Sequence, residues 1–229
     1  MKPLFLLALI SLSCLSVTAD DEGKHLFLLS GQSNMSRFQH KQFFIPAVQA
    51  AYGPDKVIII KNAQGGQPIS KWYKAWASSK GEKPKETGQL YDSLIESVKE
   101  KTAGVQIKSV TFIWMQGEAD VKADNVDVYA KSFRGLLGQL EKDLNRKDIN
   151  IIIGRLSDFG LKKRSNPNWG QMRKVQMALA NENPRACWVD TDDLNGKKHS
   201  LHYVKPEGYR KLGERYVEAA KKLIKENNK

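Results

Sequence analysis

The stretch HLFLLSGQSNM, residues 25–35, runs from a continuous apolar segment into a short polar turn. An apolar run of this length that meets a glycine is typical of a buried strand followed by a tight turn. Similar runs recur, and we predict strands over residues 25–30, 57–61, 109–115, 150–156 and 186–190. Because the runs are nearly continuous rather than alternating, they indicate a parallel sheet covered on both faces.

Segments with apolar residues at helical spacing separate these runs. In the last of them, Tyr209, Leu212, Tyr216 and Leu223 fall on one face of a predicted helix. Strands that alternate with helices predict an α/β fold, here a three-layer α/β/α sandwich with a mostly parallel five-stranded sheet. Ligands bind outside the carboxyl ends of the strands in such folds. A polar motif that directly follows a strand is therefore a candidate site.

Residues 1–19 have the features of a signal peptide. Lys2 precedes an apolar segment, and Val17, Thr18 and Ala19 provide small residues for cleavage. We therefore expect a protein that is secreted or periplasmic after cleavage, with residues 20–229 forming a single catalytic domain. No later segment is apolar over a length that would span a bilayer.

The formal net charge of the chain is +12. The lysines are spread along the sequence, and no dense basic block with interleaved aromatic residues occurs, so nucleic-acid binding is not predicted. An excess of positive charge slightly favours an anionic glycan as the partner. The sequence does not indicate an oligomeric state.

Two glycine-containing motifs follow the first two predicted strands. In GQSNM, residues 31–35, Ser33 stands at a strand end, where backbone N–H groups can hold a developing oxyanion. A helix cap is the alternative role of such a serine. In NAQGGQ, residues 62–67, Gly65 and Gly66 let a backbone amide approach a ligand. Trp72 comes next, with Tyr73 and Trp76, and these rings either stack on a sugar or pack in the core.

Two further motifs follow the third strand and precede the last helix. In WMQGEAD, residues 114–120, the side chain of Gln116 can donate to an oxyanion, and Glu118 and Asp120 either serve the site or cap the next helix. In HSLHY, residues 199–203, a histidine can reach back over the strand ends. There it would act as general base for Ser33.

Together these motifs resemble the SGNH-hydrolase superfamily. The nearest branch is the sialate O-acetylesterase-like one, which includes the acetylxylan esterases of carbohydrate esterase family 6. The resemblance extends from about residue 25 to residue 220. It implies the flavodoxin-like SGNH hydrolase fold. It also implies a serine esterase that removes O-acetyl groups from a carbohydrate, with no metal or organic cofactor.

By this resemblance, Ser33 is the nucleophile and His202 is the base. Two backbone amides and one side-chain amide are implied as the oxyanion hole, those of Ser33, Gly66 (or Gly65) and Gln116. We expect the substrate to contact Trp72 and Asn34.

One position departs from the superfamily pattern. An aspartate usually stands three residues before the catalytic histidine, and here that residue is His199. An imidazole cannot supply the fixed negative charge that orients the base. Glu118 is the first candidate for this role, Asp190, Asp192 and Asp193 are alternatives, and a dyad without an acid is another arrangement. The departure also leaves open a non-catalytic glycan-binding protein, and a lipase or thioesterase could use the same residues.

Overall fold

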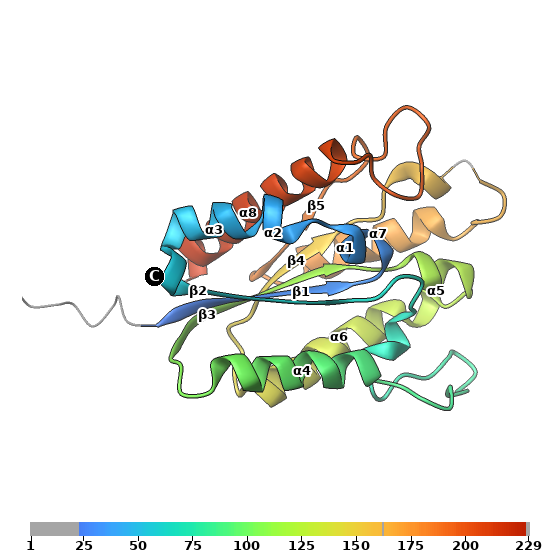
Figure 1. The fold of residues 1–229 in the computed structure, drawn as a ribbon. Coiled ribbons are helices and arrows are strands. Elements are labelled where there is room, and N and C mark those ends of the chain that lie inside the picture. Colours follow the sequence, from blue (N-terminus) through green and yellow to red (C-terminus); the bar gives the residue numbers. More distant parts are fainter. Residues whose placement is uncertain (1–22, 162, 228–229) are drawn as a thin grey trace, which may run out of the picture.

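The computed structural model describes residues 23–161 and 163–227. Within this part of the chain, five parallel strands form one sheet in the order β2-β1-β3-β4-β5 (Figure 1). The strands are β1 (Lys24–Gly31), β2 (Val57–Ala63), β3 (Ile107–Met115), β4 (Asn150–Gly154) and β5 (Ala186–Val189). The predicted strands and the predicted α/β/α sandwich are confirmed.

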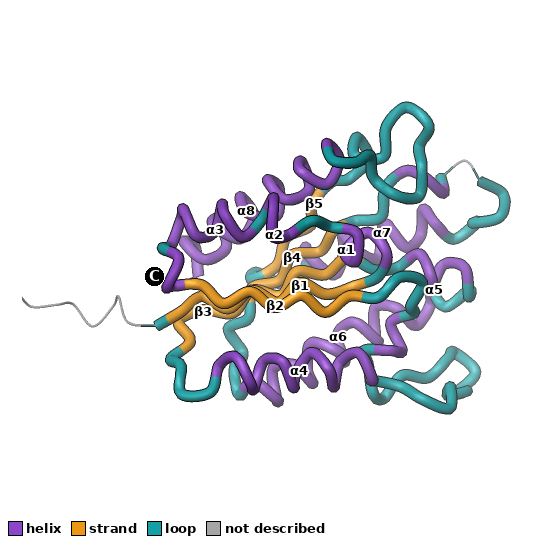
Figure 2. Tube along the Cα trace, viewed as in Figure 1, coloured by secondary structure: helices purple, strands orange, loops and turns teal. Residues whose placement is uncertain are grey.

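Helices cover both faces of the sheet (Figures 1 and 2). One face carries α3 (Ile45–Tyr52) and α8 (Glu207–Asn227), and the other carries α4 (Gln89–Thr102) and α6 (Val126–Leu144). Because α7 (Trp169–Asn181) packs against α6, β4 and β5, it belongs to the same layer as α6. The shorter helices are α1 (Ser33–Arg37), α2 (His40–Phe43), α5 (Glu118–Lys122), η2 (Pro54–Lys56), η3 (Ile69–Lys71) and η4 (Asp158–Gly160).

The burial of the elements matches the pattern of the sequence. All five residues of β4 are buried, and the inner strand β1 is buried at every position after Lys24. In α8, the predicted apolar face is inside the core, with Tyr209, Leu212 and Tyr216 fully buried. Burial of each large apolar side chain contributes about 1.5–3 kcal/mol, so these faces supply much of the stability of the sandwich.

The strand order places a ligand site beside β1. The chain moves from β1 to β2 on one side and later adds β3 on the other side of β1. Such a reversal is the topological switch point at which doubly wound sheets bind ligands. Gly31, at the end of β1, pairs with Met115 at the end of β3. The first and third sequence motifs therefore begin side by side.

The described residues share one hydrophobic core, which extends over both faces of the sheet. Among them, no helix combines the length and the apolar character that a bilayer crossing requires. The expected signal peptide, residues 1–19, lies outside the described residues.

Candidate active site

The turn after β1 fixes the position of Ser33. Gly31 has a φ of 140°, and a Cβ at this residue would lie 2.0 Å from the carbonyl oxygen of Met115. Only glycine fits here, because the neighbouring strand occupies the space and L side chains rarely adopt this backbone conformation. The N–H of Gln32 then donates to the same carbonyl oxygen at 2.9 Å. Ser33 begins α1 and lies, partly exposed, at the carboxyl end of β1.

The buried side chain of Gln32 joins the first motif to the third. Its Oε1 accepts hydrogen bonds from the N–H of Ala119 at 3.1 Å and from Nε2 of Gln116 at 3.2 Å. Buried polar atoms normally have such partners, and here both partners belong to the segment after β3. The bonds hold the start of α5, which carries Glu118, against the start of α1, which carries Ser33.

A cavity of about 840 Å³ opens at this edge of the sheet. Its wall contains residues from all four sequence motifs, among them Ser33, Gly66, Glu118 and His202. The volume falls within the range of about 300–1,000 Å³ that is usual for small-molecule sites. The structure thus brings together four predicted site residues that lie far apart in the sequence.

His202 is partly exposed on the cavity wall. Burial lowers its pKa below the usual value of histidine, and the positive charges of Arg37 and Lys205 lower it further. The imidazole is therefore mainly neutral at pH 7 and can accept a proton. In the described part of the chain, no hydrogen bond joins His202 to Ser33 or Glu118, although all three line the cavity.

Glu118 is almost completely buried, with 7% of its surface exposed. Burial is the main cause that raises the pKa of its carboxyl group to about 7. Its Oε1 accepts a hydrogen bond from Nδ2 of Asn34 at 3.2 Å, whereas Oε2 has no hydrogen-bond partner among the described residues. Glu118 lines the cavity, but Oε2 itself is buried, so it is an acceptor left without a donor in the part of the chain that the structure describes.

Asn34 connects Glu118 to the segment that carries His202. Its Nδ2 also donates to the carbonyl oxygen of Leu201 at 3.1 Å, and its Oδ1 accepts from the hydroxyl of Tyr209 at 3.2 Å. Only 2% of Asn34 is exposed, so its side chain has little surface for a ligand. Asn34, which was expected to contact the substrate, holds two parts of the cavity wall together.

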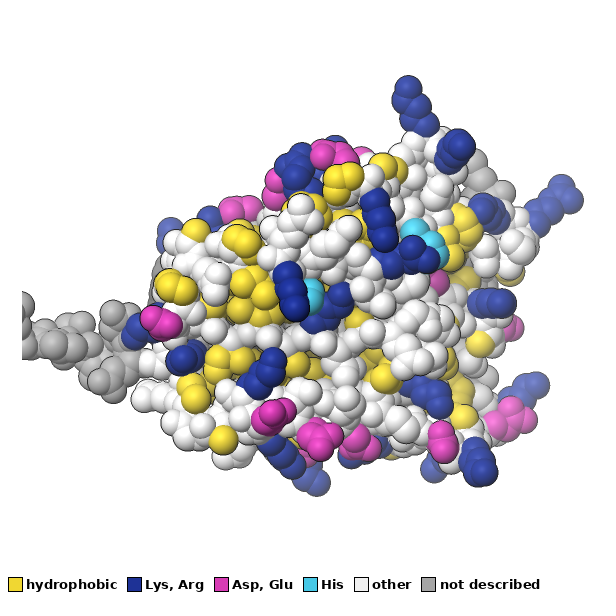
Figure 3. Space-filling model, in the orientation of Figure 1, with side chains coloured by type: hydrophobic (Ala, Val, Ile, Leu, Met, Phe, Trp, Pro, Cys, Tyr) yellow, Lys and Arg dark blue, Asp and Glu magenta, His cyan; other side chains and the backbone are white. Residues whose placement is uncertain are grey.

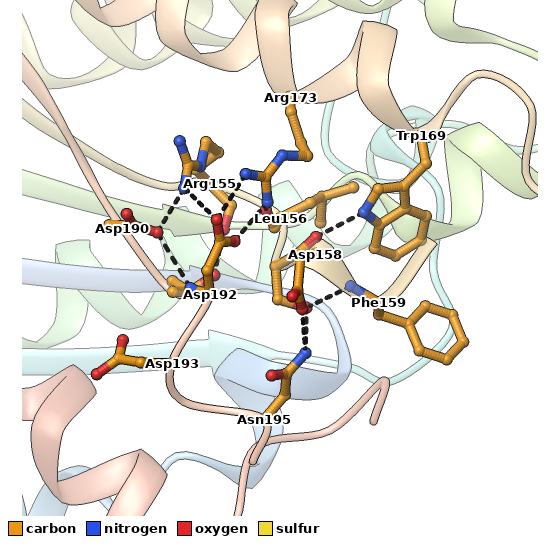
Figure 4. Close-up of polar contacts among 12 residues, drawn as sticks. Arg155, Leu156, Asp158, Phe159, Trp169, Arg173, Asp190, Asp192, Asp193 and Asn195 are labelled. Atoms are coloured by element: carbon orange, nitrogen blue, oxygen red, sulfur yellow. Dashed lines mark hydrogen bonds and ion pairs between the residues drawn. The ribbon is translucent and has the colours of Figure 1, made fainter. Parts of the chain in front are cut away.

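His199 stands where the superfamily usually has the aspartate that supports the base, but it pairs with Asp158. Its Nδ1 lies 2.5 Å from Oδ2 of Asp158, in the η4 turn after β4. The other oxygen of Asp158 accepts from Nδ2 of Asn195 at 2.9 Å (Figure 4). His199 also has a φ of 44°, a left-handed conformation that is uncommon outside glycine. The histidine segment is thereby tied to the loop after β4.

The alternative acids follow β5 and are all paired with arginine, and Figure 4 shows the pairs of Asp190 and Asp192. Asp190 pairs with Arg155. Asp192 pairs with Arg155 at 2.9 Å and with Arg173 at 2.6 Å.

Asp193 pairs with Arg215 at 2.7 Å. The described wall of the cavity includes none of the three aspartates, whereas it does include Glu118. Among the predicted acids, Glu118 is therefore the one in reach of the cavity.

Gly65 and Gly66 lie where a backbone amide could donate a hydrogen bond to a ligand at Ser33. Gly66 lines the cavity, and a Cβ added to it would meet no atom within 4 Å. A Cβ on Gly65 would lie 3.8 Å from the Cβ of Ser33. Both glycines are exposed, so their backbone is accessible beside the serine.

The side-chain amide of Gln116, which the resemblance implied as a donor to the oxyanion, is hydrogen-bonded to protein groups in this structure. This residue is fully buried, and its Nε2 donates to Oδ2 of Asp120 at 2.5 Å and to the carbonyl oxygen of Gln67 at 3.1 Å. Its side-chain donors are thus directed at protein acceptors and not at the cavity. Asp120 is also buried, and burial raises its pKa to about 6. Both residues brace the segment that carries Glu118.

Trp72, which was expected to contact the substrate or to pack in the core, lies in the hydrophobic core. Its ring is fully buried and packs edge-on against Trp114, with ring centroids 5.0 Å apart. The aromatic residues of the cavity wall are Phe159 and Trp169, which come from the loop after β4 and from α7. Sequence reasoning missed Phe159, although its place just after a predicted strand was a signal that could have found it.

A sequence model of the family described as "Carbohydrate esterase, sialic acid-specific acetylesterase" matches residues 38–222. The matched range includes Gly66, Glu118 and His202 and begins after Ser33. No curated protein matches the sequence significantly.

Solved structures share the fold at low sequence identity. A protein from Arabidopsis thaliana is 19% identical, with a TM-score of 0.66 over 87% of this chain and 98% of that chain. A carbohydrate acetylesterase from Xanthomonas citri is 17% identical, with a TM-score of 0.65 over 87% of this chain and 56% of that chain. Axe2, an acetylxylan esterase from Geobacillus stearothermophilus, is 14% identical, with a TM-score of 0.59 over 86% of this chain and 94% of that chain.

Proposed function

The chain belongs to the carbohydrate esterase family of sialic acid-specific acetylesterases, and we propose that it removes O-acetyl groups from a carbohydrate through an acyl-serine intermediate. The observation that carries this proposal is the single cavity that Ser33, Gly66, Glu118 and His202 line together. These are the residue types that acyl transfer requires: a nucleophile, an amide donor, a carboxylate and a base.

In the proposed reaction, Oγ of Ser33 attacks the acetyl carbonyl carbon while its proton passes to His202. The protonated imidazole then gives this proton to the sugar oxygen as the C–O bond breaks, which leaves acetyl-serine. Water attacks the acetyl-serine with His202 again as base, and acetate and free Ser33 result. The lowered pKa of His202 supports this role, because the imidazole starts neutral at pH 7.

We assign Glu118 as the acid that supports His202. Its Oε2 has no hydrogen-bond partner among the described residues, and Asn34 bridges its other oxygen to the residue before His202. Protonation of His202 during the reaction would favour the ionised form of Glu118, since opposite charges stabilise one another. The N–H groups of Ser33 and Gly66, with Gly65 as the alternative to Gly66, are the proposed donors to the oxyanion.

Acetate release from a short acetyl ester and from acetylated glycans tests the proposal. We expect Ser33→Ala to lower kcat/KM by about 10³-fold or more, because the nucleophile is removed. A covalent serine probe should label the wild type and leave the variant unlabelled. The matched control is Ser36→Ala, a change at an exposed serine of the same short helix, which should retain activity and labelling.

Two results would contradict the proposal. One is hydrolysis that Ser33→Ala leaves unchanged. The other is a folded wild type that releases no acetate from any ester and takes up no probe. The second result would favour a glycan-binding protein, whereas preference for long acyl chains would favour a lipase or thioesterase.

A further inference from the structure

A second, smaller pocket adjoins the cavity. Its volume is about 200 Å³, below the range of about 300–1,000 Å³ that whole small-molecule sites usually occupy. The pocket is lined by Asp158, Phe159, Leu161, Lys163, Lys198 and His199. Phe159 lines both the pocket and the larger cavity. The size and the shared wall suit one part of a ligand whose other part lies in the cavity.

The carboxylate of the pocket is already satisfied. Oδ2 of Asp158 pairs with Nδ1 of His199, and Oδ1 accepts a hydrogen bond from Nδ2 of Asn195. Each oxygen of Asp158 therefore already has a donor in the folded chain, and the two lysines of the pocket outnumber this one acidic side chain.

The lysines of the pocket have no such partner. Nζ of Lys163 lies 3.4 Å from the ring centroid of Phe159, and Lys198 is exposed. Within residues 23–161 and 163–227, neither lysine forms an ion pair with a carboxylate. By contrast, Arg155, just after β4, and Arg173, in α7, are both paired with Asp192 (Figure 4).

The mouth of the larger cavity has the same sign of charge. Arg37 and Lys122 line it, are exposed, and have no ion-pair partner among the described residues. Figure 3 shows that Lys and Arg side chains project from the end of the molecule to which the carboxyl ends of the strands point. Unpaired cations around a concave site attract an anionic ligand.

We propose that the second pocket binds an anionic sugar residue, carrying a carboxylate or a sulfate group, next to the acetylated sugar of an oligosaccharide. The inference rests on the proposed function, because the acetyl ester would lie at Ser33. Lys163 and Lys198 would pair with the anionic group. The half-buried ring of Phe159 would support the sugar rings between the two sites.

Kinetics with three kinds of acetylated oligosaccharide test the pocket: oligogalacturonates, sulfated galactans and neutral xylo-oligosaccharides. We expect the double variant Lys163→Gln/Lys198→Gln to raise KM for the anionic substrates by about 10-fold, which corresponds to about 1.4 kcal/mol. KM for the neutral oligosaccharide and for a short acetyl ester should stay the same. The two anionic arms show whether carboxylate or sulfate is preferred.

The matched control is Lys99→Gln/Lys101→Gln, which removes the same charge from exposed positions near the end of α4, away from the cavity. This control should change none of the KM values. Equal wild-type kcat/KM for neutral and anionic oligosaccharides would overturn the proposal. So would an equal loss on all substrates in the Lys163→Gln/Lys198→Gln variant.

Binding of unacetylated oligosaccharides, measured by calorimetry, separates this proposal from the proposed function. If the wild type hydrolyses no ester, the proposed function fails. The pocket proposal then still requires that an oligogalacturonate or a sulfated galactan bind more weakly to the Lys163→Gln/Lys198→Gln variant than to the wild type. Equal binding of both oligosaccharides to the two proteins would overturn it.

Discussion

Glu118 shows how one buried carboxyl group can serve a site at a cost to stability. Its pKa is raised to about 7, mainly by burial, so that near neutral pH the protonated and ionised forms coexist. A carboxylate that ionises where a base becomes protonated would stabilise that base. The same burial makes the ionised form unfavourable in the folded protein when no such partner is present.

We predict that Glu118→Gln lowers kcat while raising stability in mildly alkaline solution. Because the pKa is raised in the folded state, the protonated carboxyl group contributes to the free energy of unfolding. This contribution is fully present below about pH 4.5 and is lost as the pH rises through about 7. Between about pH 4.5 and about pH 8, the free energy of unfolding of the wild type should therefore fall by up to about 3 kcal/mol relative to that of the variant.

Urea unfolding at about pH 5 and about pH 8 measures this difference. The exposed Glu96→Gln on α4 is the control, and its stability should follow the wild type at both pH values. A Glu118→Gln protein whose stability changes with pH as the wild type does would contradict the assigned burial effect.

At the scale of elements, the cavity depends on two loops that are tied together at their polar side chains. The loop after β4 contributes Phe159 to the cavity wall, and the loop before α8 contributes His202. Asp158 joins them, since it binds both His199 and Asn195. Loops held by tertiary bonds of this kind keep catalytic groups in place better than free loops do.

We predict that Asp158→Asn lowers kcat for a short acetyl ester by about 10-fold with little change in KM, because His202 would be less well positioned. Steady-state kinetics and thermal unfolding check the outcome together. The control is Asp55→Asn, an exposed change in η2, which precedes β2 and therefore lies at the opposite edge of the sheet. Unchanged kcat in a folded Asp158→Asn protein would show that the tie does not position the base.

The elements themselves could be predicted because the strands are buried on both faces and so read as apolar runs. The one signal for Phe159 and Asp158 was their position just after a predicted strand. The loop has no periodicity and no motif that would have distinguished them from other loop residues. Trp72 could not be placed either. A tryptophan that follows a glycine motif has the same sequence signature whether it faces a ligand or, as here, packs on Trp114.

At the scale of the whole molecule, the site forms because segments that are distant in the sequence come together in the fold. Four motifs could be assigned to one edge of the sheet, because carboxyl ends of parallel strands share an edge. The direction of the Gln116 side chain could not be predicted. It depends on the position of Asp120 and Gln67 in the folded chain.

We also propose that the whole chain is exported. Expression of the full sequence in a bacterium should yield a protein in the periplasm or the medium whose N-terminus is Asp20, because Val17-Thr18-Ala19 suits signal peptidase. N-terminal sequencing and intact mass measure this. A chain that starts at residue 20 is the control and should stay in the cytoplasm. Full-length protein that remains in the cytoplasm would contradict export.

The contact between Gly31 and the Met115 carbonyl indicates which positions of this protein tolerate substitution and which do not. The position of Ser33 depends on the contact between the backbones of Gly31 and Met115. Substitution of the side chains at these two positions therefore cannot adjust it. Phe159 and Lys163, in the loop after β4, are at least partly exposed. Directed evolution of substrate preference should therefore recover working variants from that loop and almost none from the turn after β1.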